Sequence, residues 1–157
     1  MSEQKDREII EWMRGSPTAT VDLFRMLTGE VIGRGAFRTV YDCDLNDKWV
    51  VKVETSSGEF SNTTEWQVWE WCNLCHPYIA EKYLAPCRFI SPCGLFLIQD
   101  KTTKTDLKNY PKKVPAFLNN DIKESNWGLY KDRVVCHDYG MLRYTAGSKL
   151  EKVRWHD

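Results

Sequence analysis

The sequence lacks an excess of charge of either sign. It contains 22 Lys and Arg residues and 22 Asp and Glu residues, so the formal net charge at neutral pH is zero. Proteins that bind nucleic acid without sequence preference normally need a positive surface that attracts phosphates. The charge balance therefore disfavours a general nucleic-acid-binding protein and leaves only a local basic patch open.

The sequence also lacks a long hydrophobic run. Its longest apolar stretches, such as residues 94–98, are far shorter than the roughly 20 residues that a helix needs to cross a bilayer. Residues 2–7 are highly polar, and no apolar segment typical of a signal peptide follows them. These absences predict a protein without membrane association that stays in the cytoplasm.

Six cysteines are present, and a reducing cytoplasm favours free thiols over disulfides. Residues 72–76 match the C-x-x-C-H pattern of covalent haem attachment, which normally takes place outside the cytoplasm. A zinc site is the other alternative, with the ligands Cys72, Cys75, Cys87 and Cys93. Structural zinc sites use tighter pairs than Cys87 and Cys93, which also have prolines beside them. Thiols without a cofactor are therefore the favoured interpretation.

The length of 157 residues predicts about one domain, in which residues 1–28 form a helical extension. Ile9, Ile10 and Met13 form a short apolar stripe at helical spacing, and Ser16 followed by Pro17 is typical of an N-cap. We expect a second helix to end at Gly29 and to pack on the next layer through Val21, Phe24 and Leu27.

From residue 30 the hydrophobic period changes to that of strands, and an α+β fold follows. Five strands are expected at residues 30–33, 38–43, 48–54, 88–91 and 95–99. A helix is expected at residues 62–74, with Asn62 as its cap and Glu65 in a capping-box position. Further elements are a polar connector (101–113), a helical turn (115–118), a strand pair (127–130 and 133–136), and a solvated tail or short helix (149–157).

Residues 33–41 form a glycine-rich hairpin with the sequence GRGAFRTVY. Glycines let a backbone approach a phosphate closely and present amide donors to its oxygens, although most such hairpins are only turns. Lys52 follows within an apolar strand, where a lysine either reaches water or has a fixed partner. Glu65 in the next helix is a candidate partner.

Two further motifs follow in order along the chain. Asp121 is followed five positions later by Asn126, and a β-run at residues 134–137 ends in Asp138-Tyr139-Gly140. The ordered set of glycine loop, strand lysine, helix glutamate, D-x4-N and D-Y-G resembles the protein-kinase-like superfamily, which includes protein kinases and small-molecule phosphotransferases. Residues 76–79 (HPYI) resemble the turn that follows the regulatory helix of kinases. The resemblance covers roughly residues 29–141.

The resemblance implies a role for each matching residue. Gly33 and Gly35 would cover the phosphates of ATP, and Lys52 would hold the α- and β-phosphates while paired with Glu65, for which Glu70 is the rival. Asp121 would accept the proton of the attacking hydroxyl. The adenine would lie near Ile98, Gln99 and Asp100, and the ligands of Mg²⁺ would be Asn126 and Asp138.

The sequence also departs from the family pattern. Arg38 stands in place of the third glycine, where it would either contact a phosphate or block the pocket. Asn119 and Asn120 replace the His-Arg pair before the catalytic Asp, and Tyr139 replaces Phe. Only 17 residues follow Gly140, which leaves no room for an activation segment or a helical lobe. Such a protein resembles the compact kinase-like proteins of phages and mobile elements.

The predicted organisation is an N-terminal helical extension (1–28), a kinase-like small lobe (29–100) and a connector with a minimal catalytic loop (101–157). The small lobe would have a five-stranded antiparallel sheet and one main helix, and the large lobe would be drastically reduced. The implied function is transfer of the γ-phosphoryl group of ATP, with Mg²⁺, to a hydroxyl group of a protein or small molecule.

A pseudokinase is the alternative interpretation, with little or no catalysis and a role as an interaction module or inhibitor of a host protein. Trp66, Trp69 and Trp71 cannot all face inward from one helix. An exposed aromatic patch would then be the contact surface for a protein partner.

Overall fold

The computed structural model describes residues 3–14, 20–56, 58–140 and 149–155. The chain divides into two compact units, each built from two stretches of sequence. Met1–Asn62 and Cys87–Asp100 make up the first, here called the sheet unit. Thr63–Pro86 and Lys101–Asp157 make up the second, here called the hairpin unit. The domain boundaries expected at residues 28 and 100 stay a prediction.

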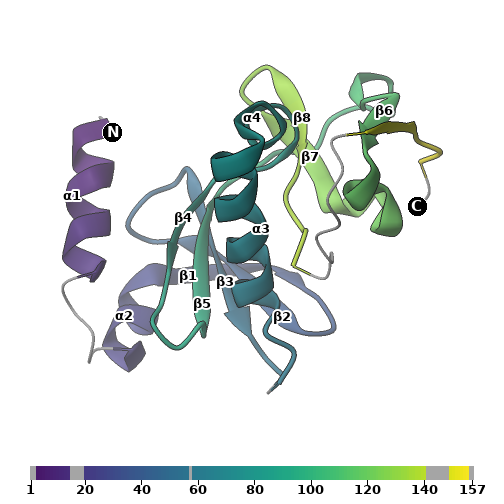
Figure 1. Cartoon of the computed structure of the whole chain (residues 1–157). Coiled ribbons are helices and arrows are strands. Elements are labelled where there is room, and N and C mark those ends of the chain that lie inside the picture. The colour runs from purple at the N-terminus through teal and green to yellow at the C-terminus, as the bar shows by residue number, and fades with distance from the viewer. Residues whose placement is uncertain (1–2, 15–19, 57, 141–148, 156–157) are drawn as a thin grey trace. The chain divides into compact units, whose positions relative to one another are not determined.

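The sheet unit contains a five-stranded antiparallel sheet, whose strands are labelled in Figure 1. Hydrogen bonding gives the strand order β1-β2-β3-β5-β4. The strands are β1 (Thr28–Arg34), β2 (Arg38–Cys43), β3 (Trp49–Glu54), β4 (Cys87–Ile90) and β5 (Phe96–Asp100). Trp49, Val51 and Val53 alternate along β3 and enter one hydrophobic core. The predicted α+β class and the five strands are confirmed.

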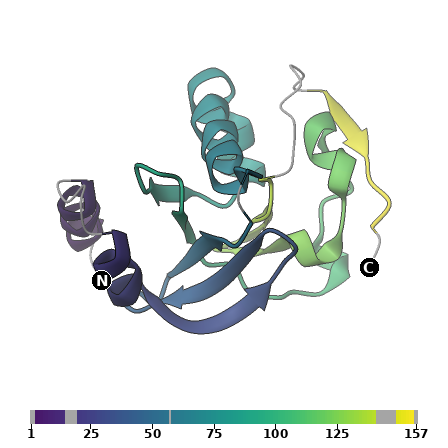
Figure 2. The same cartoon turned by 90° about the horizontal axis from the view of Figure 1, so that it is seen from below.

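Two N-terminal helices, α1 (Glu3–Arg14) and α2 (Thr20–Leu27), contribute Met13, Leu23 and Leu27 to this core. This confirms the predicted packing role of the extension. Figure 2 draws both helices at the purple end of the colour scale. The second helix ends at Leu27 rather than Gly29, since β1 starts at Thr28, whose hydroxyl donates to Phe24 O at 2.7 Å. The expected cap at Ser16 and Pro17 lies outside the described residues.

The main helix, α3 (Ser61–Cys75), follows β3 as predicted, but Asn62 is not its cap. The helix already includes Ser61, and the backbone N–H of Asn62 donates to the Glu54 carboxylate. The Asn62 side chain instead donates to the carbonyls of Lys52, Gly94 and Leu95 at 3.0, 3.1 and 3.0 Å. Asn62 therefore joins β3 to the β4–β5 turn, and Glu54 serves the first turn of the helix.

The hairpin unit continues with α4 (Pro77–Tyr83), which was expected only as a turn. Two 3₁₀ turns, η2 (Ala116–Asp121) and η3 (Glu124–Asn126), precede the predicted hairpin of β7 (Trp127–Tyr130) and β8 (Arg133–Cys136). The connector contains only the 3₁₀ turn η1 (Leu107–Asn109) among its described residues before β6. The main chain joins α4 to β8, since Ala85 N donates to Cys136 O at 2.8 Å.

The prediction of a solvated tail or short helix at residues 149–157 is wrong. Strand β9 (Leu150–Lys152) pairs antiparallel with β6 (Lys113–Pro115). Trp155 Nε1 donates to Pro111 O at 3.1 Å, and its ring lies 5.2 Å from that of Trp127 and 4.7 Å from that of Tyr110. Aromatic packing and β-pairing thus hold this segment on the unit.

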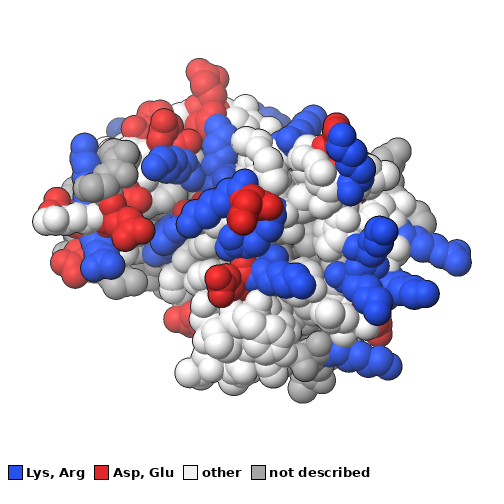
Figure 3. All heavy atoms as spheres, turned by 90° about the horizontal axis from the view of Figure 1, so that it is seen from above, with Lys and Arg blue, Asp and Glu red and all other residues white. Residues whose placement is uncertain are grey.

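No helix among the described residues is long and apolar enough to span a membrane. Both signs of charge are interspersed on the face drawn in Figure 3, and neither sign covers it alone.

Candidate active site

The glycine-rich hairpin connects β1 to β2 in the sheet unit. Gly33 pairs with Val40, and the backbone N–H of Gly35 donates to Arg38 O at 2.8 Å. A Cβ atom added to Gly33 would meet only Val40 Cβ at 3.8 Å, and one added to Gly35 would meet only Arg38 O at 3.5 Å. The glycines with positive φ lie elsewhere in the described chain, at Gly58 and Gly94. Neither packing nor backbone conformation requires these two glycines, and a phosphate could use the space they leave.

Arg38, the departure from the family pattern, is held inside the sheet unit. Its side chain is buried, and Nη1 donates to Asn62 Oδ1 at 3.2 Å. The guanidinium group thus shares the residue that joins β3 to the β4–β5 turn. Contact between Arg38 and a phosphate stays a prediction.

Lys52 lies in the middle of β3, between Val40 of β2 and Leu97 of β5. It is only 3% exposed, and Glu65 in α3 is completely buried. Buried charges are costly unless they are paired and hydrogen-bonded, so both positions fit a specific role better than a general solvated one. Lys52 belongs to the sheet unit and Glu65 to the hairpin unit, and their pairing stays a prediction. Glu70, the rival glutamate, is exposed.

Gln99, expected near the adenine, is completely buried in β5, where it pairs with Val50 and Cys87. Its Nε2 atom lies 3.8 Å from Cys87 Sγ. The neighbouring Asp100 binds Arg88 through both carboxylate oxygens, with Nε to Oδ1 at 2.7 Å. This end of β5 is therefore fixed by side-chain interactions within the sheet unit, and the adenine contact of Gln99 stays a prediction.

The hairpin unit brings Asp121 and Asn126 together. Asn126 Nδ2 donates to Asp121 Oδ2 at 3.2 Å and to Asp121 O at 3.3 Å, and Asn126 is buried. Lys123 Nζ forms an ion pair with Asp121 Oδ1 at 3.1 Å. The Asp121 side chain remains 40% exposed, so its carboxylate is oriented and accessible at once. No role for Lys123 was predicted from the sequence, although its position two residues after Asp121 indicated a possible ion pair.

The Asp138-Tyr139-Gly140 segment is joined to the same loop. The backbone N–H of His137 donates to Asn126 O at 2.8 Å, which places the residue before Asp138 beside Asn126. Tyr139 is fully buried, and its hydroxyl donates to Ala85 O at 2.8 Å, whereas Asp138 is exposed. The buried tyrosine thus anchors the segment while the carboxylate faces the surface.

The donor set of this unit fits a magnesium ion held jointly by the protein and a phosphate. Asn126 uses its amide nitrogen on Asp121, so its Oδ1 oxygen is the atom that would bind a metal, together with the Asp138 carboxylate. Such hard oxygen donors are the ligands that Mg²⁺ prefers. Within the described ranges, no group of three His, Cys, Asp or Glu residues could hold a metal by itself, so phosphate oxygens and water would complete the shell.

The surroundings of the cysteines and tryptophans are not typical of a cofactor site or of a surface that binds a protein partner. No disulfide joins the six cysteines, all of which the structure describes. Burial raises the pKa of Cys72 to about 12, which disfavours the thiolate that binds metals. The six tryptophans whose burial the structure describes are buried or half-buried, including Trp66, Trp69 and Trp71. Trp66, Trp69 and Trp71 are only half-buried, and nothing in their described surroundings supports the predicted partner surface on α3.

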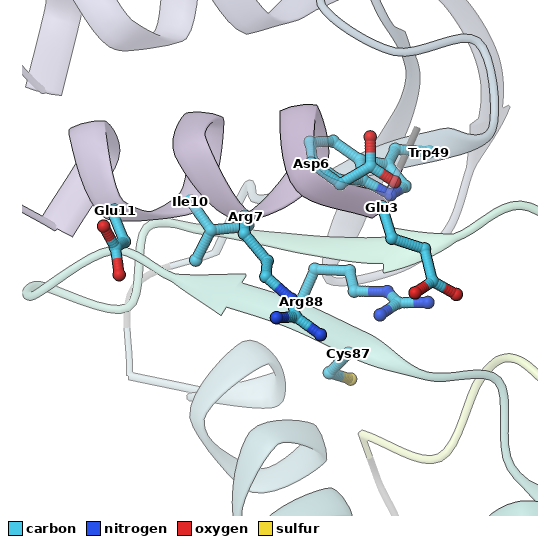
Figure 4. A pocket seen from close by; sticks show the side chains of 8 residues that line it. All are labelled: Glu3, Asp6, Arg7, Ile10, Glu11, Trp49, Cys87 and Arg88. Carbon is cyan, nitrogen blue, oxygen red and sulfur yellow. The ribbon is translucent and has the colours of Figure 1, made fainter. Parts of the chain in front are cut away.

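A separate recess of about 500 Å³ lies in the sheet unit, where α1 passes β3 and β4 (Figure 4). Carboxylates and guanidinium groups both line it, including Asp6, Arg7 and Arg88. The side chains of Arg7 and Arg88 extend into it from α1 and β4, as Figure 4 shows. None of the predicted site residues lines this recess.

The topology and the motif positions agree. A five-stranded antiparallel sheet carries the glycine hairpin on its first two strands and the lysine on its third, and the main helix follows that strand. This arrangement matches the predicted small lobe, with its five-stranded antiparallel sheet and one main helix.

No family model matches the chain, and no curated protein matches it. Among solved structures it is similar to APH(2'')-IIa in a ternary complex with streptomycin and ATP, with 16% identity over 55% of this chain and 28% of that chain, at a TM-score of 0.41. It is also similar to a Legionella pneumophila kinase bound to IP6, with 15% identity over 76% of this chain and 50% of that chain, at a TM-score of 0.46. The matched part thus spans half or less of the length of these proteins.

Proposed function

We propose that the protein binds ATP with Mg²⁺ and transfers the γ-phosphoryl group to a hydroxyl group of a protein or small molecule. The observation that carries this proposal is the loop at residues 121–126. It holds an oriented, accessible carboxylate on Asp121, with an amide from Asn126 on one oxygen and the Lys123 ammonium on the other. Phosphoryl transfer needs positioning and charge neutralisation more than covalent help from the protein.

In this proposal Asp121 accepts the proton of the attacking hydroxyl. Each carboxylate oxygen has two lone pairs, so the bonds to Asn126 and Lys123 orient the group and leave a lone pair that can accept the proton of the hydroxyl. Lys123 is 57% exposed, and its charge offsets negative charge that develops close to the carboxylate.

The other predicted site residues bind the nucleotide. Gly33 and Gly35 leave open space beside the backbone for phosphates, and Lys52 supplies a buried positive charge. Asn126 and Asp138 would supply the oxygen ligands for Mg²⁺, which would neutralise the negative charge of the phosphates.

Calorimetric titration with ATP, with and without Mg²⁺, tests the binding step. We expect Mg²⁺-dependent binding that Lys52→Ala and Asp138→Ala weaken, because each removes a charge that contacts the phosphates or the metal. Asp132→Ala is the matched control, since this carboxylate is 90% exposed on the β7–β8 turn. Absence of binding at millimolar ATP would overturn the proposal.

Turnover is measured separately as release of ADP from ATP and as incorporation of labelled phosphate. Asp121→Ala should abolish both and leave ATP affinity within twofold of the wild-type value. Equal activity in this variant would contradict the role of Asp121. Mg²⁺-dependent binding without turnover in the wild type would favour the second candidate, a pseudokinase. The observation in favour of a pseudokinase is the buried Arg38 at the glycine hairpin.

A further inference from the structure

The imidazole of His137 contacts two other segments of the hairpin unit. Its Nε2 atom lies 2.9 Å from Ser125 O, and its Nδ1 atom lies 2.7 Å from Thr102 Oγ1. Ser125 precedes Asn126, and His137 precedes Asp138. The ring therefore lies directly beside both residues to which the proposed function assigns the metal.

The hydrogen-bond partners determine the tautomer of a neutral ring. A carbonyl oxygen can only accept, so Nε2 must carry the proton in the bond to Ser125. The lone pair of Nδ1 then accepts from the Thr102 hydroxyl. Thr102 thus holds the ring in the orientation in which it can donate to the loop that carries Asn126.

The main chain keeps Thr102 in place. Thr103 N donates to Leu129 O at 3.0 Å, and Leu129 N donates to Thr103 O at 2.7 Å, so the connector lies along β7. A Cβ atom on Gly128 would lie 2.5 Å from Thr102 Oγ1 and 2.8 Å from Thr102 Cβ. Glycine at position 128 is therefore what lets the Thr102 hydroxyl reach the histidine.

We propose that Thr102 and His137 are positioning residues that set the spacing between Asn126 and Asp138. This inference rests on the proposed function, because it assigns the two positioned residues to Mg²⁺. Two bonds from one ring and the bond from His137 N to Asn126 O cross-link the connector, the loop and the Asp138 segment. Groups that orient metal ligands in this way typically change metal affinity by about 10- to 100-fold when they are removed.

The decisive comparison is Thr102→Val with Thr102→Ser. Valine keeps the shape of threonine but cannot donate to Nδ1, whereas serine keeps the hydroxyl. We expect Thr102→Val to lower the affinity for ATP by about tenfold when Mg²⁺ is present and to leave the affinity without Mg²⁺ unchanged. Thr102→Ser should stay within twofold of the wild type in both measurements. A structural defect alone would lower the affinity for ATP both with and without Mg²⁺, and Thr102→Ser would show the same loss. Thr102→Ala replaces Thr102→Val if the valine variant is unfolded.

Two measurements without nucleotide separate this inference from the proposed function. NMR of the imidazole nitrogens should show protonated Nε2 and unprotonated Nδ1 in the wild type, with the Nδ1 shift changed in Thr102→Val only. Amide hydrogen exchange over residues 123–126 should rise in Thr102→Val and not in Thr102→Ser. Unchanged exchange together with unchanged Mg²⁺ dependence would overturn the inference. If the NMR and exchange results are as expected but the wild-type protein binds no Mg²⁺-ATP, the contact between Thr102 and His137 is confirmed. The proposed function is then overturned, and the positioning role with it.

Discussion

Two hairpins of the molecule contain glycine for different reasons. In the β7–β8 hairpin, a Cβ atom on Gly128 would collide with Thr102 and would lie 3.0 Å from Thr103 O. In the β1–β2 hairpin, Cβ atoms on Gly33 and Gly35 would make only ordinary contacts at 3.8 and 3.5 Å. Close packing accounts for the first glycine, and nothing in the fold accounts for the other two.

The turns of these hairpins show the same contrast from the backbone side. Lys131, in the two-residue loop of the β7–β8 hairpin, has a φ of 56°, where glycine would be favoured. This hairpin thus lacks a glycine where its backbone favours one. The β1–β2 hairpin has two where neither backbone nor packing demands one, and this is the space that the proposed function assigns to phosphates.

The largest effect is expected for Gly128→Ala. The added methyl group would have to displace Thr102 and the main chain at Thr103, so the free energy of unfolding should fall by about 1–3 kcal/mol. Urea denaturation of this variant measures the loss, and Gly33→Ala is the matched control in the other hairpin. Equal stability of Gly128→Ala and the wild type would remove the contrast between the hairpins.

The double variant Gly33→Ala/Gly35→Ala should reverse this pattern. Because both sites have room, its free energy of unfolding should stay level or rise by up to about 1 kcal/mol. Its affinity for Mg²⁺-ATP should fall about tenfold, which corresponds to about 1.4 kcal/mol. Calorimetry and urea denaturation of one preparation give both values. Unchanged ATP affinity would contradict the phosphate role of this hairpin.

The smallest effect is expected for Lys131→Gly. Glycine adopts a positive φ without steric cost, so relief of the turn should raise the free energy of unfolding by roughly 0.5–1 kcal/mol. Asp132→Gly, at the other turn residue, should not stabilise the protein, since Asp132 has no positive φ. Stabilisation by both variants would mean that the conformation of Lys131 is not the cause.

Local patterns predicted most of the strands. β-branched and aromatic residues placed β2 within its observed bounds, and the β7–β8 hairpin was predicted residue for residue. Helix α4 was missed because Pro77 leads a segment of only seven residues, too short for a clear helical period. Strands β6 and β9 have three residues each, and their pairing depends on segments far apart in the sequence.

The candidate site was predictable only where its parts are close in sequence. The spacing of Asp121 and Asn126 indicated the loop, and the structure joins these two side chains directly. Thr102 and His137 are 35 positions apart in the sequence, and no sequence motif indicates their contact. Asn62 was misread because an asparagine at a helix start has the same sequence pattern whether it caps the helix or binds neighbouring carbonyls.

The strand order of the sheet has a consequence for biosynthesis. Strand β5 lies between β3 and β4, yet it is the last of the five strands to be made. Until it emerges from the ribosome, β3 has an open edge and its apolar residues Trp49, Val51 and Val53 lack the core around Phe96 and Ile98. A nascent chain that stalls between residues 55 and 95 would therefore present an unpaired, hydrophobic strand edge, which is the kind of surface that chaperones bind and that aggregates grow from.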